Sequence, residues 1–306
     1  MLDKKTLSKF GVGAWGLGGF AQHDPNNDDD SQINAVAYTL NKGINFIVIN
    51  YWNSEGHSLE IISKAIKKSQ IARKDLFYVQ VIYDYNNPTI KDVEAEFEQC
   101  LEKFETNYID SLEFSLTAII KYGFENIVNL VQRYLREGKI RYTSVTNFNL
   151  DYLKRYYSVF GNKLFSHELC YNFEIRENET LGITEYGNKH GIINVLYQPL
   201  RRNRTANRNW PLLVKLASKY QKTQNQIILN WISSKGFHPL IKSEKIAHID
   251  ENISAFDFTI EPNDLERLNN FEVNKYITPK IDWFMTGDGT KIHALPNEFD
   301  DKYPYL

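Results

Sequence analysis

Short apolar runs alternate along the chain with longer segments whose apolar residues recur at helical spacing. The short runs are typical of buried strands, and the longer segments are typical of helices that pack through one face. One such unit has a strand over Ile44–Ile49, a polar and aromatic loop over Asn50–Gly56, and a helix over Ser58–Lys68. The rest of the chain repeats this unit.

The same pattern gives the positions of the other elements. Thr89 and Asp92 form a capping-box pattern, Asn149 can cap a helix, and Gly138 can end one. Strands are expected over Phe10–Trp15, Leu76–Val81, Ser111–Leu116 and Arg141–Thr146, and in the runs 164–169, 193–198 and 238–242. Helices are expected over 28–40, Thr89–Phe104, Glu125–Arg136, Thr180–Lys189, Pro211–Tyr220, Asn225–Lys235 and Ala247–Ser254.

Regular alternation of strands and helices requires parallel strands joined by right-handed crossovers. The sequence therefore predicts an α/β fold, a (β/α)8 TIM barrel over residues 1–272, with a C-terminal tail over residues 273–306 that packs across the active face. A doubly wound open sheet is the alternative. Gly11, Gly13 and Gly16 resemble its dinucleotide fingerprint, but they precede any helix and lack the strand-turn-helix context.

Net charge and cysteine content limit which ligands and which compartment the sequence suits. The net charge is −2 and the pI about 6.4, so no positive field would attract nucleic acid or an anionic membrane. Cys100 and Cys170 lack metal-ligand spacing and are expected to be free buried thiols. No signal-peptide run or membrane span is apparent, and we expect a cytoplasmic protein. The sequence is silent on oligomeric state.

Seven ordered segments across nearly the whole chain resemble the aldo-keto reductases. They are GVGAWGLGG, GINFIVINYWNSEGHSLEIISKA, NYIDSLEFS, REGKIRYTSVTNFN, CYNFEIR, VLYQPL and IKSEKIAHIDENISAFDF. The resemblance implies a barrel enzyme that reduces carbonyl groups with hydride from NADPH. It also implies four catalytic positions, for aspartate, tyrosine, lysine and histidine, which fall here on Val48, Asn53, Val81 and Ser115.

Proton delivery then either falls to another group or is not required, as for a protonated imine or an activated alkene, and the candidate catalytic residues are Glu113, Glu168, Tyr51 and Tyr83. Strand alternation places Glu113 on the same face as Ser115, toward the barrel interior, where burial raises a carboxyl pKa. A strand shifted by one residue would instead turn Glu113 toward a helix. Glu168 stands where the family has a glutamine near the nicotinamide.

The cofactor positions depart less from the family pattern, so NADP(H) is the expected cofactor. By resemblance, Thr146 and Asn147 hold the nicotinamide amide and Tyr197 stacks on its ring. Lys242 and Ser243 match the 2′-phosphate site, where a cation and a hydroxyl suit a phosphate. The remaining expected contacts are His248 in place of an arginine, Glu251 and Asn252 at the adenine, and Arg201, with Arg202, Arg204 and Arg208, at the pyrophosphate.

The expected ligand is a small molecule held by loops at the strand ends, in a pocket lined by Trp15, Trp52, Asn53, His57, Asp84 and Ser115. His57, at the start of a helix, more often has a structural role. No metal is expected, because His23 and the run Asp28–Asp30 are explained by a solvated turn and a helix cap.

Three functions remain open. The first is an atypical NADP(H)-dependent oxidoreductase acting on a small carbonyl, imine or activated alkene. The second is a lyase or isomerase that uses the carboxylates as acid and base. The third is a non-catalytic protein that binds a nucleotide or another ligand.

Overall fold

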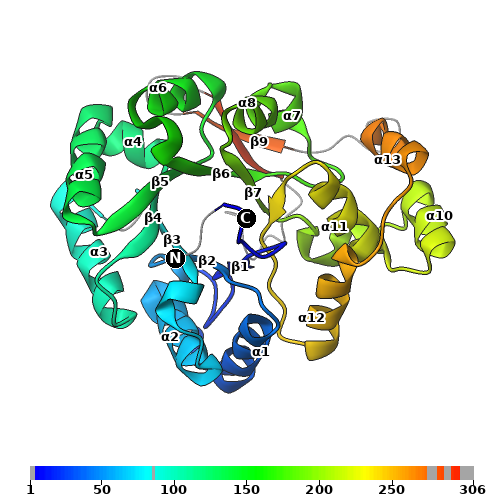
Figure 1. Ribbon diagram of the computed structural model, residues 1–306, viewed down its shortest axis with the longest axis horizontal. Helices are drawn as coiled ribbons and strands as arrows, with labels where there is room; N and C mark the ends of the chain where they lie inside the picture. The colour runs from blue at the N-terminus through cyan, green and yellow to red at the C-terminus, as the bar shows by residue number, and fades with distance from the viewer. Residues whose placement is uncertain (1–3, 85–86, 274–280, 286–290, 297–306) are drawn as a thin grey trace.

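Eight parallel strands follow one another around a barrel, with helices outside them (Figure 1). The computed structural model describes residues 4–84, 87–273, 281–285 and 291–296. The first and last strands meet where the amide of Gly11 donates to Pro239 O (3.0 Å) and the amide of Ile241 donates to Gly11 O (2.8 Å). This contact closes the barrel, which confirms the predicted fold and rules out the open sheet.

The strands lie close to their predicted positions. They are β1 (Val12–Gly13), β2 (Phe46–Asn50), β3 (Phe77–Ile82), β4 (Ile109–Ser115), β5 (Ile140–Thr146), β6 (Leu164–Cys170), β7 (Ile193–Tyr197) and β8 (His238–Pro239). The first and last strands are shorter than predicted. In both, the paired segment ends early and the chain continues into the loops of the C-terminal rim.

The helices begin at the capping signals found in the sequence. Asp28 accepts from the Ser31 amide (3.0 Å), Thr89 and Asp92 form the capping box, and Asn149 accepts from the Tyr152 amide (2.9 Å). The helices are α1 (Asp29–Asn41), α2 (His57–Ser69), α3 (Ile90–Lys103), α4 (Leu116–Tyr122), α5 (Phe124–Glu137), α6 (Leu150–Phe160), α7 (Glu177–Thr180), α8 (Ile183–His190), α9 (Arg204–Asn207), α10 (Pro211–Tyr220), α11 (Gln224–Ser234), α12 (Ile246–Ile253) and α13 (Pro262–Asn269).

Two helical predictions were wrong or incomplete. The helix predicted over Thr180–Lys189 corresponds to α8, which begins only at Ile183 because Gly182 adopts a left-handed φ of 72° and separates it from α7. Helix α4 was missed because its apolar residues continue directly from β4 and read as more of the strand. The Ser115 hydroxyl begins this helix by accepting from the Ala118 amide (3.0 Å).

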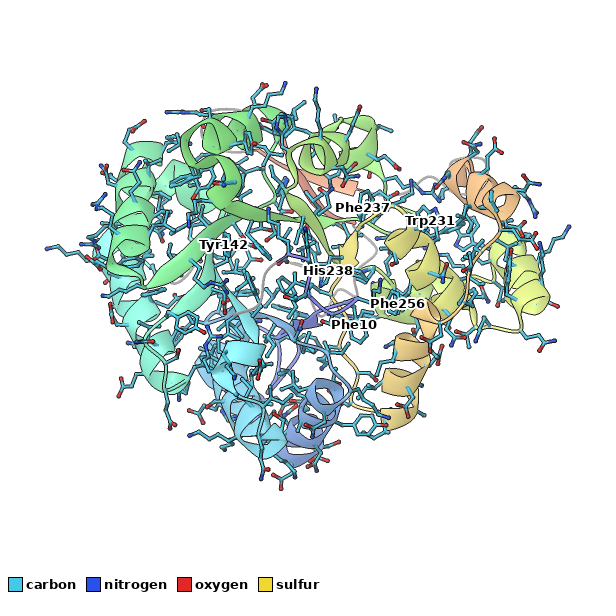
Figure 2. All side chains as sticks on the ribbon, in the orientation of Figure 1. Phe10, Tyr142, Trp231, Phe237, His238 and Phe256 are labelled. Atoms are coloured by element: carbon cyan, nitrogen blue, oxygen red, sulfur yellow. The ribbon has the colours of Figure 1, made fainter. Side chains whose placement is uncertain are left out.

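The N-terminal half of the barrel interior is aromatic. The Phe77 and Phe165 rings stack at 4.3 Å between centroids, and His238 meets Phe46 edge-on at 4.9 Å. Figure 2 shows Tyr142 and His238 inside the ring of strands. A separate hydrophobic core of aliphatic and aromatic side chains fills the space between the strands and the helices. The space left for polar side chains therefore lies toward the C-terminal ends of the strands.

Part of the tail forms an antiparallel pair of strands, β9 (Ile281–Met285) and β10 (Lys291–Pro296). The rest of the predicted 273–306 tail lies almost entirely outside the described residues, so its packing across the active face stays a prediction. Cys100 and Cys170 are buried free thiols, as expected. Among the described residues, no helix is long and apolar enough to cross a membrane.

Candidate functional site

A row of serine hydroxyls crosses the inside of the barrel. Ser144 Oγ lies 2.7 Å from Ser111 Oγ and 2.8 Å from Ser166 Oγ, so β4, β5 and β6 are joined on one face. The alternate residues of β4, Leu112 and Phe114, pack in the core under the helices. Since successive side chains of a strand point to opposite faces, the serine row faces the interior.

Glu113 and Glu168 form a carboxyl pair one layer above this row. Each follows a serine of the row by two residues, and their carboxyl groups lie close enough for each to affect the pKa of the other. They are only 1% and 6% exposed. Burial and the neighbouring Glu168 raise the pKa of Glu113 well above its usual value, and burial raises the pKa of Glu168 to about 7. The raised pKa values favour a proton on this pair near neutral pH.

Each member of the pair also has one buried oxygen to which no other described residue donates a hydrogen bond. Within the described part of the chain, Glu113 Oε1 and Glu168 Oε2 are buried and have no hydrogen-bond partner, and the same holds for Trp15 Nε1 and Gln198 Oε1. All four residues lie at or near the C-terminal ends of barrel strands. Buried polar atoms rarely stay unpaired, so this group indicates a ligand site at the C-terminal mouth of the barrel.

Several other candidates gather around the pair. The Tyr197 hydroxyl donates to Asn147 Oδ1 (2.9 Å), and the amide of Asn147 and the Thr146 hydroxyl both donate to Glu168 O (3.0 and 3.2 Å). Burial raises the pKa of the Tyr197 phenol, and nearby Tyr83 and Glu168 add to the effect. The structure thus brings together six residues that the sequence predicted for the site: Tyr83, Glu113, Thr146, Asn147, Glu168 and Tyr197.

Tyr51 and His57 make their contacts around the start of α2. The Tyr51 ring packs over Gly56, where an added Cβ would lie 3.0 Å from the ring. His57, the first residue of α2, has its Nε2 atom 2.6 Å from Oδ2 of Asp29, the first residue of α1. The His57 ring is 4.0 Å from the His23 ring, measured between centroids. These contacts fasten the loop before α1 to α2, which is the structural role expected for His57. No metal-binding group of His, Cys, Asp or Glu occurs in the described ranges.

Aromatic side chains form one wall of the mouth. Trp15 stacks on Trp52 (5.1 Å between centroids) and contacts Phe20 (5.7 Å). On another side, the Thr117 hydroxyl donates to Asp84 Oδ1 (2.6 Å) and lies 3.0 Å from the Ser115 hydroxyl. Asp84 and Ser115 are therefore held in one short polar chain. Asn53 is buried, as are Val48 and Val81.

The arginine cluster after β7 is arranged differently from the prediction. Arg201 was expected at a pyrophosphate, but its guanidinium is 2% exposed and pairs with Glu174. Glu174 also contacts Arg208 (3.2 Å) and accepts from Trp210 Nε1 (2.9 Å). Nothing in the sequence marked Glu174, which precedes Arg201 by 27 positions. Its carboxylate draws Arg201 inward and fixes the loop instead of leaving this guanidinium at the mouth.

Lys242 is likewise held by protein groups. Its Nζ donates to Gly16 O (2.9 Å) and to Glu244 Oε1 (2.9 Å), and Gln32 Nε2 also donates to Glu244 Oε1 (2.8 Å). Ser243 Oγ turns back on its own loop and accepts from the Lys245 amide (3.2 Å). Sequence reasoning missed Gln32 and Glu244.

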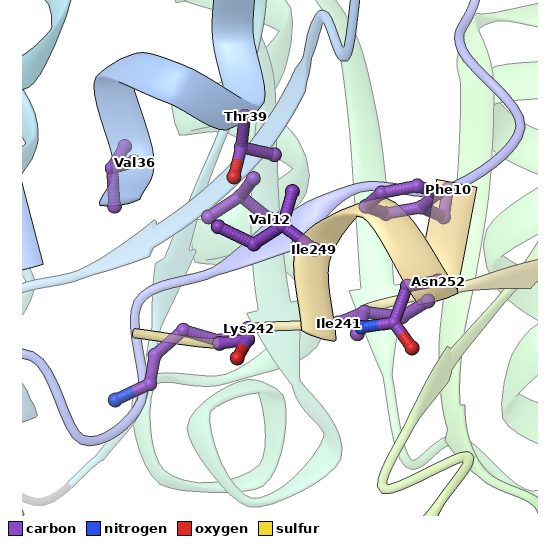
Figure 3. A pocket seen from close by; sticks show the side chains of 9 residues that line it. Phe10, Val12, Val36, Thr39, Ile241, Lys242, Ile249 and Asn252 are labelled. Atoms are coloured by element: carbon purple, nitrogen blue, oxygen red, sulfur yellow. The ribbon is translucent and has the colours of Figure 1, made fainter. Parts of the chain in front are cut away.

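A small pocket lies beside Lys242, between β1, α1 and α12 (Figure 3). Its lining is Phe10, Val12, Val36, Thr39, Ile241, Lys242, Ser243, Ile249 and Asn252. Val12 and Ile249 crowd together in Figure 3, whereas Lys242 extends away from them. Of the residues expected at the adenine, Asn252 lines this pocket, whereas Glu251 accepts a hydrogen bond from the Thr223 hydroxyl (2.5 Å). His248, expected in place of an arginine, is exposed.

Comparison with known proteins gives one family. Residues 9–272 match the profile of the aldo/keto reductase family. The glyoxal reductase of Bacillus subtilis is 24% identical over 88% of this chain and 92% of its own length. A thermostable aldo-keto reductase in complex with epalrestat has a TM-score of 0.78 at 26% identity, covering 86% of this chain and 94% of its own. An aldo-keto reductase from Klebsiella pneumoniae in complex with NADPH has a TM-score of 0.74 at 19% identity, covering 86% and 90%.

Proposed function

Because this chain belongs to the aldo/keto reductase family, we propose that it is an oxidoreductase for a small carbonyl, imine or activated alkene. The hydride carrier would be a nicotinamide dinucleotide. The Glu113–Glu168 carboxyl pair would exchange the proton in place of the usual catalytic side chains. The observation that carries the proposal is this pair of buried carboxyl groups near the mouth of the barrel, whose pKa values are raised by burial.

The sequence resemblance puts the four usual catalytic positions on Val48, Asn53, Val81 and Ser115. None of these side chains titrates near neutral pH, and all four are buried. Glu113 is paired in register with Val81 across β3 and β4 and lies two residues before Ser115, so the pair stands beside two of the positions where the resemblance expects a titrating group. This supports a replacement of the proton donor within the same part of the barrel.

The residues around the pair suit the nicotinamide end of a dinucleotide. Tyr197 offers a partly exposed ring, and Asn147 and Gln198 offer amide groups on either side of the strand ends. When bound, the dinucleotide would supply or accept a hydride. Glu168 would donate a proton to the substrate during reduction and take it back during oxidation, with Glu113 as its neighbouring carboxyl group. Thr146 and Asn147 would position Glu168 through its backbone carbonyl.

A second candidate, a lyase or isomerase, is favoured by the same pair, since two coupled carboxyl groups can act as acid and base without a hydride carrier. The two functions differ in one requirement. The oxidoreductase needs a reduced dinucleotide in stoichiometric amounts, whereas the lyase or isomerase would turn over without one.

The test is a turnover assay on the purified protein with NADH and with NADPH. Glyoxal and methylglyoxal serve as first substrates, because relatives are named glyoxal reductase and methylglyoxal reductase. The key variant is Glu168→Gln. Glu96→Gln is the matched control, since Glu96 is also a buried acid with a raised pKa, but its partner Asn87 lies outside the barrel interior.

We expect Glu168→Gln to lower kcat by about 10²- to 10⁴-fold, the usual contribution of general acid catalysis, while Glu96→Gln keeps the wild-type rate. Equal rates in wild type and Glu168→Gln would refute the role of the pair. Failure of both dinucleotides to bind would refute the oxidoreductase itself.

A further inference from the structure

An acidic side chain occupies the place where the resemblance would put the 2′-phosphate of NADP(H). Glu244 lies two residues after Lys242, and their charged atoms are 2.9 Å apart. Burial opposes it, yet the hydrogen bonds from Lys242 and Gln32 lower the pKa of Glu244, so this carboxylate is charged at neutral pH. The ammonium expected to attract a phosphate is already neutralised by the protein.

The arrangement is built by three elements and does not depend on one flexible side chain. Gln32, on α1, is 3% exposed and donates to both Glu244 Oε1 (2.8 Å) and Gly16 O (3.1 Å). Its own Oε1 accepts from the Gly18 amide (2.8 Å). Lys242 donates to the same two acceptors, Gly16 O and Glu244 Oε1. Helix α1, the glycine turn after β1 and the segment after β8 are thus joined around Glu244.

Two groups that the resemblance assigns to the phosphate, at positions 243 and 248, do not compensate. Ser243 Oγ is engaged with the Lys245 amide, and His248 stands where the resemblance has an arginine. A 2′-phosphate carries between about −1.5 and −2 charges at neutral pH, by analogy with other phosphate monoesters. It would meet the Glu244 carboxylate at close range, and the Lys242 ammonium is already paired with that carboxylate. This arrangement disfavours a 2′-phosphate beside Lys242.

A ribose with a free 2′-hydroxyl does fit. A hydroxyl can donate to a carboxylate, which is how acidic residues select unphosphorylated dinucleotides in other folds. Both protein donors bind Oε1 of Glu244, and among the described contacts Oε2 is left to accept from a ligand. The adjoining pocket supplies apolar walls from Val12 and Ile249 and the buried amide of Asn252.

We infer that Glu244 selects the unphosphorylated dinucleotide, so that the protein binds NAD(H) in preference to NADP(H). This inference rests on the proposed function, because it assumes that a nicotinamide dinucleotide binds at the barrel mouth. NAD(H), which lacks the 2′-phosphate, thereby replaces NADP(H) as the expected cofactor.

The test is a titration of the purified protein with NADH and with NADPH, followed by nucleotide fluorescence and repeated with Glu244→Gln. The substitution removes one charge and keeps the shape and the hydrogen bonds to Lys242. Glu98→Gln is the matched control, because Glu98 pairs with Lys139 (2.5 Å) on the outer face and is similarly exposed.

We expect wild type to bind NADH more tightly than NADPH by about tenfold or more, as like charges in contact are costly. Glu244→Gln should tighten NADPH binding by a similar factor and leave NADH binding within about threefold. Glu98→Gln should change neither. Tighter binding of NADPH by wild type, or an unchanged preference in Glu244→Gln, would overturn the inference and leave the proposed function standing. Binding of neither nucleotide would overturn the proposed function.

Discussion

The ion pair between Glu174 and Arg201 makes a stability prediction that can be worked out from the structure. Both side chains are almost fully buried, at 1% and 2% exposed, and Glu174 also binds Arg208 and Trp210. Glu174→Gln would keep a hydrogen-bond acceptor for Trp210 but leave a buried guanidinium facing a neutral amide. Breaking a buried pair in this way costs about 3–5 kcal/mol.

The pair also holds a loop with unusual backbone angles. Gln198, Arg201 and Arg202 have φ values of 56°, 48° and 53°, in the left-handed region that residues other than glycine rarely adopt. Each such residue costs about 1–3 kcal/mol, and persists only where the surrounding contacts fix it. Losing the Glu174 contact should therefore loosen the loop after β7 as well as lower the stability of the whole barrel.

Urea unfolding measures the effect directly. We expect Glu174→Gln to lower the free energy of unfolding by about 3–5 kcal/mol with little change in the slope against urea. Glu125→Gln is the control, because its pair with Arg155 spans 3.4 Å and both side chains are exposed, 77% and 53%. That pair should contribute about 0–1 kcal/mol. A loss below about 1 kcal/mol in Glu174→Gln, as for a surface pair, would refute the reasoning.

Other predictions concern pH and backbone space. Burial raises the pKa of Glu96 from 4.5 to about 7, so the stability that Glu96 contributes is complete below pH 4.5 and is lost as the pH rises through about 7. In thermal unfolding across this pH range, Glu96→Gln should lose less stability than the wild type as the pH rises. Burial lowers the pKa of His167 from 6.5 to about 3, so stability should fall as the pH drops below 6.5, and His167→Gln should show less acid sensitivity in the same assay. Gly18→Ala should destabilise more than Gly43→Ala in thermal unfolding. Both glycines have positive φ, but a Cβ on Gly18 would lie 2.6 Å from a side-chain carbon, whereas Gly43 has nothing within 4 Å. Equal losses would contradict the steric explanation.

Much of the fold follows from local patterns in the sequence. The alternation of apolar runs and amphipathic segments gives the barrel, and short-range signals such as the Thr89–Asp92 box give helix starts, because each depends only on neighbouring residues. Helix α4 escaped because an apolar run without polar spacing does not distinguish helix from strand. The inward turn of Arg201 escaped because its partner Glu174 comes from a distant loop.

The carboxyl pair could be predicted only in part. Alternation along β4 places Glu113 inside the barrel, as expected. The inward orientation of Glu168 depends on a β-bulge. Thr143 pairs with Leu164 and Val145 pairs with His167, so β6 contains one extra residue between these positions. Without that residue His167 would take the inner position and Glu168 would face the helices, because a shift of one residue exchanges the two faces of a strand. No local pattern in the sequence marks this bulge.

The central claim is that the Glu113–Glu168 pair supplies the proton for a dinucleotide-dependent reduction, and the pH dependence of kcat tests it most directly. The rate of reduced dinucleotide oxidation would be followed for wild type and for Glu168→Gln. An acid must be protonated to donate, and burial raises the pKa of Glu168 to about 7. The account predicts that the wild-type kcat falls as the pH rises through about 7, and that this fall is absent from the residual activity of Glu168→Gln. A wild-type rate that is constant across this range, or a variant that keeps both the rate and the fall, would contradict it.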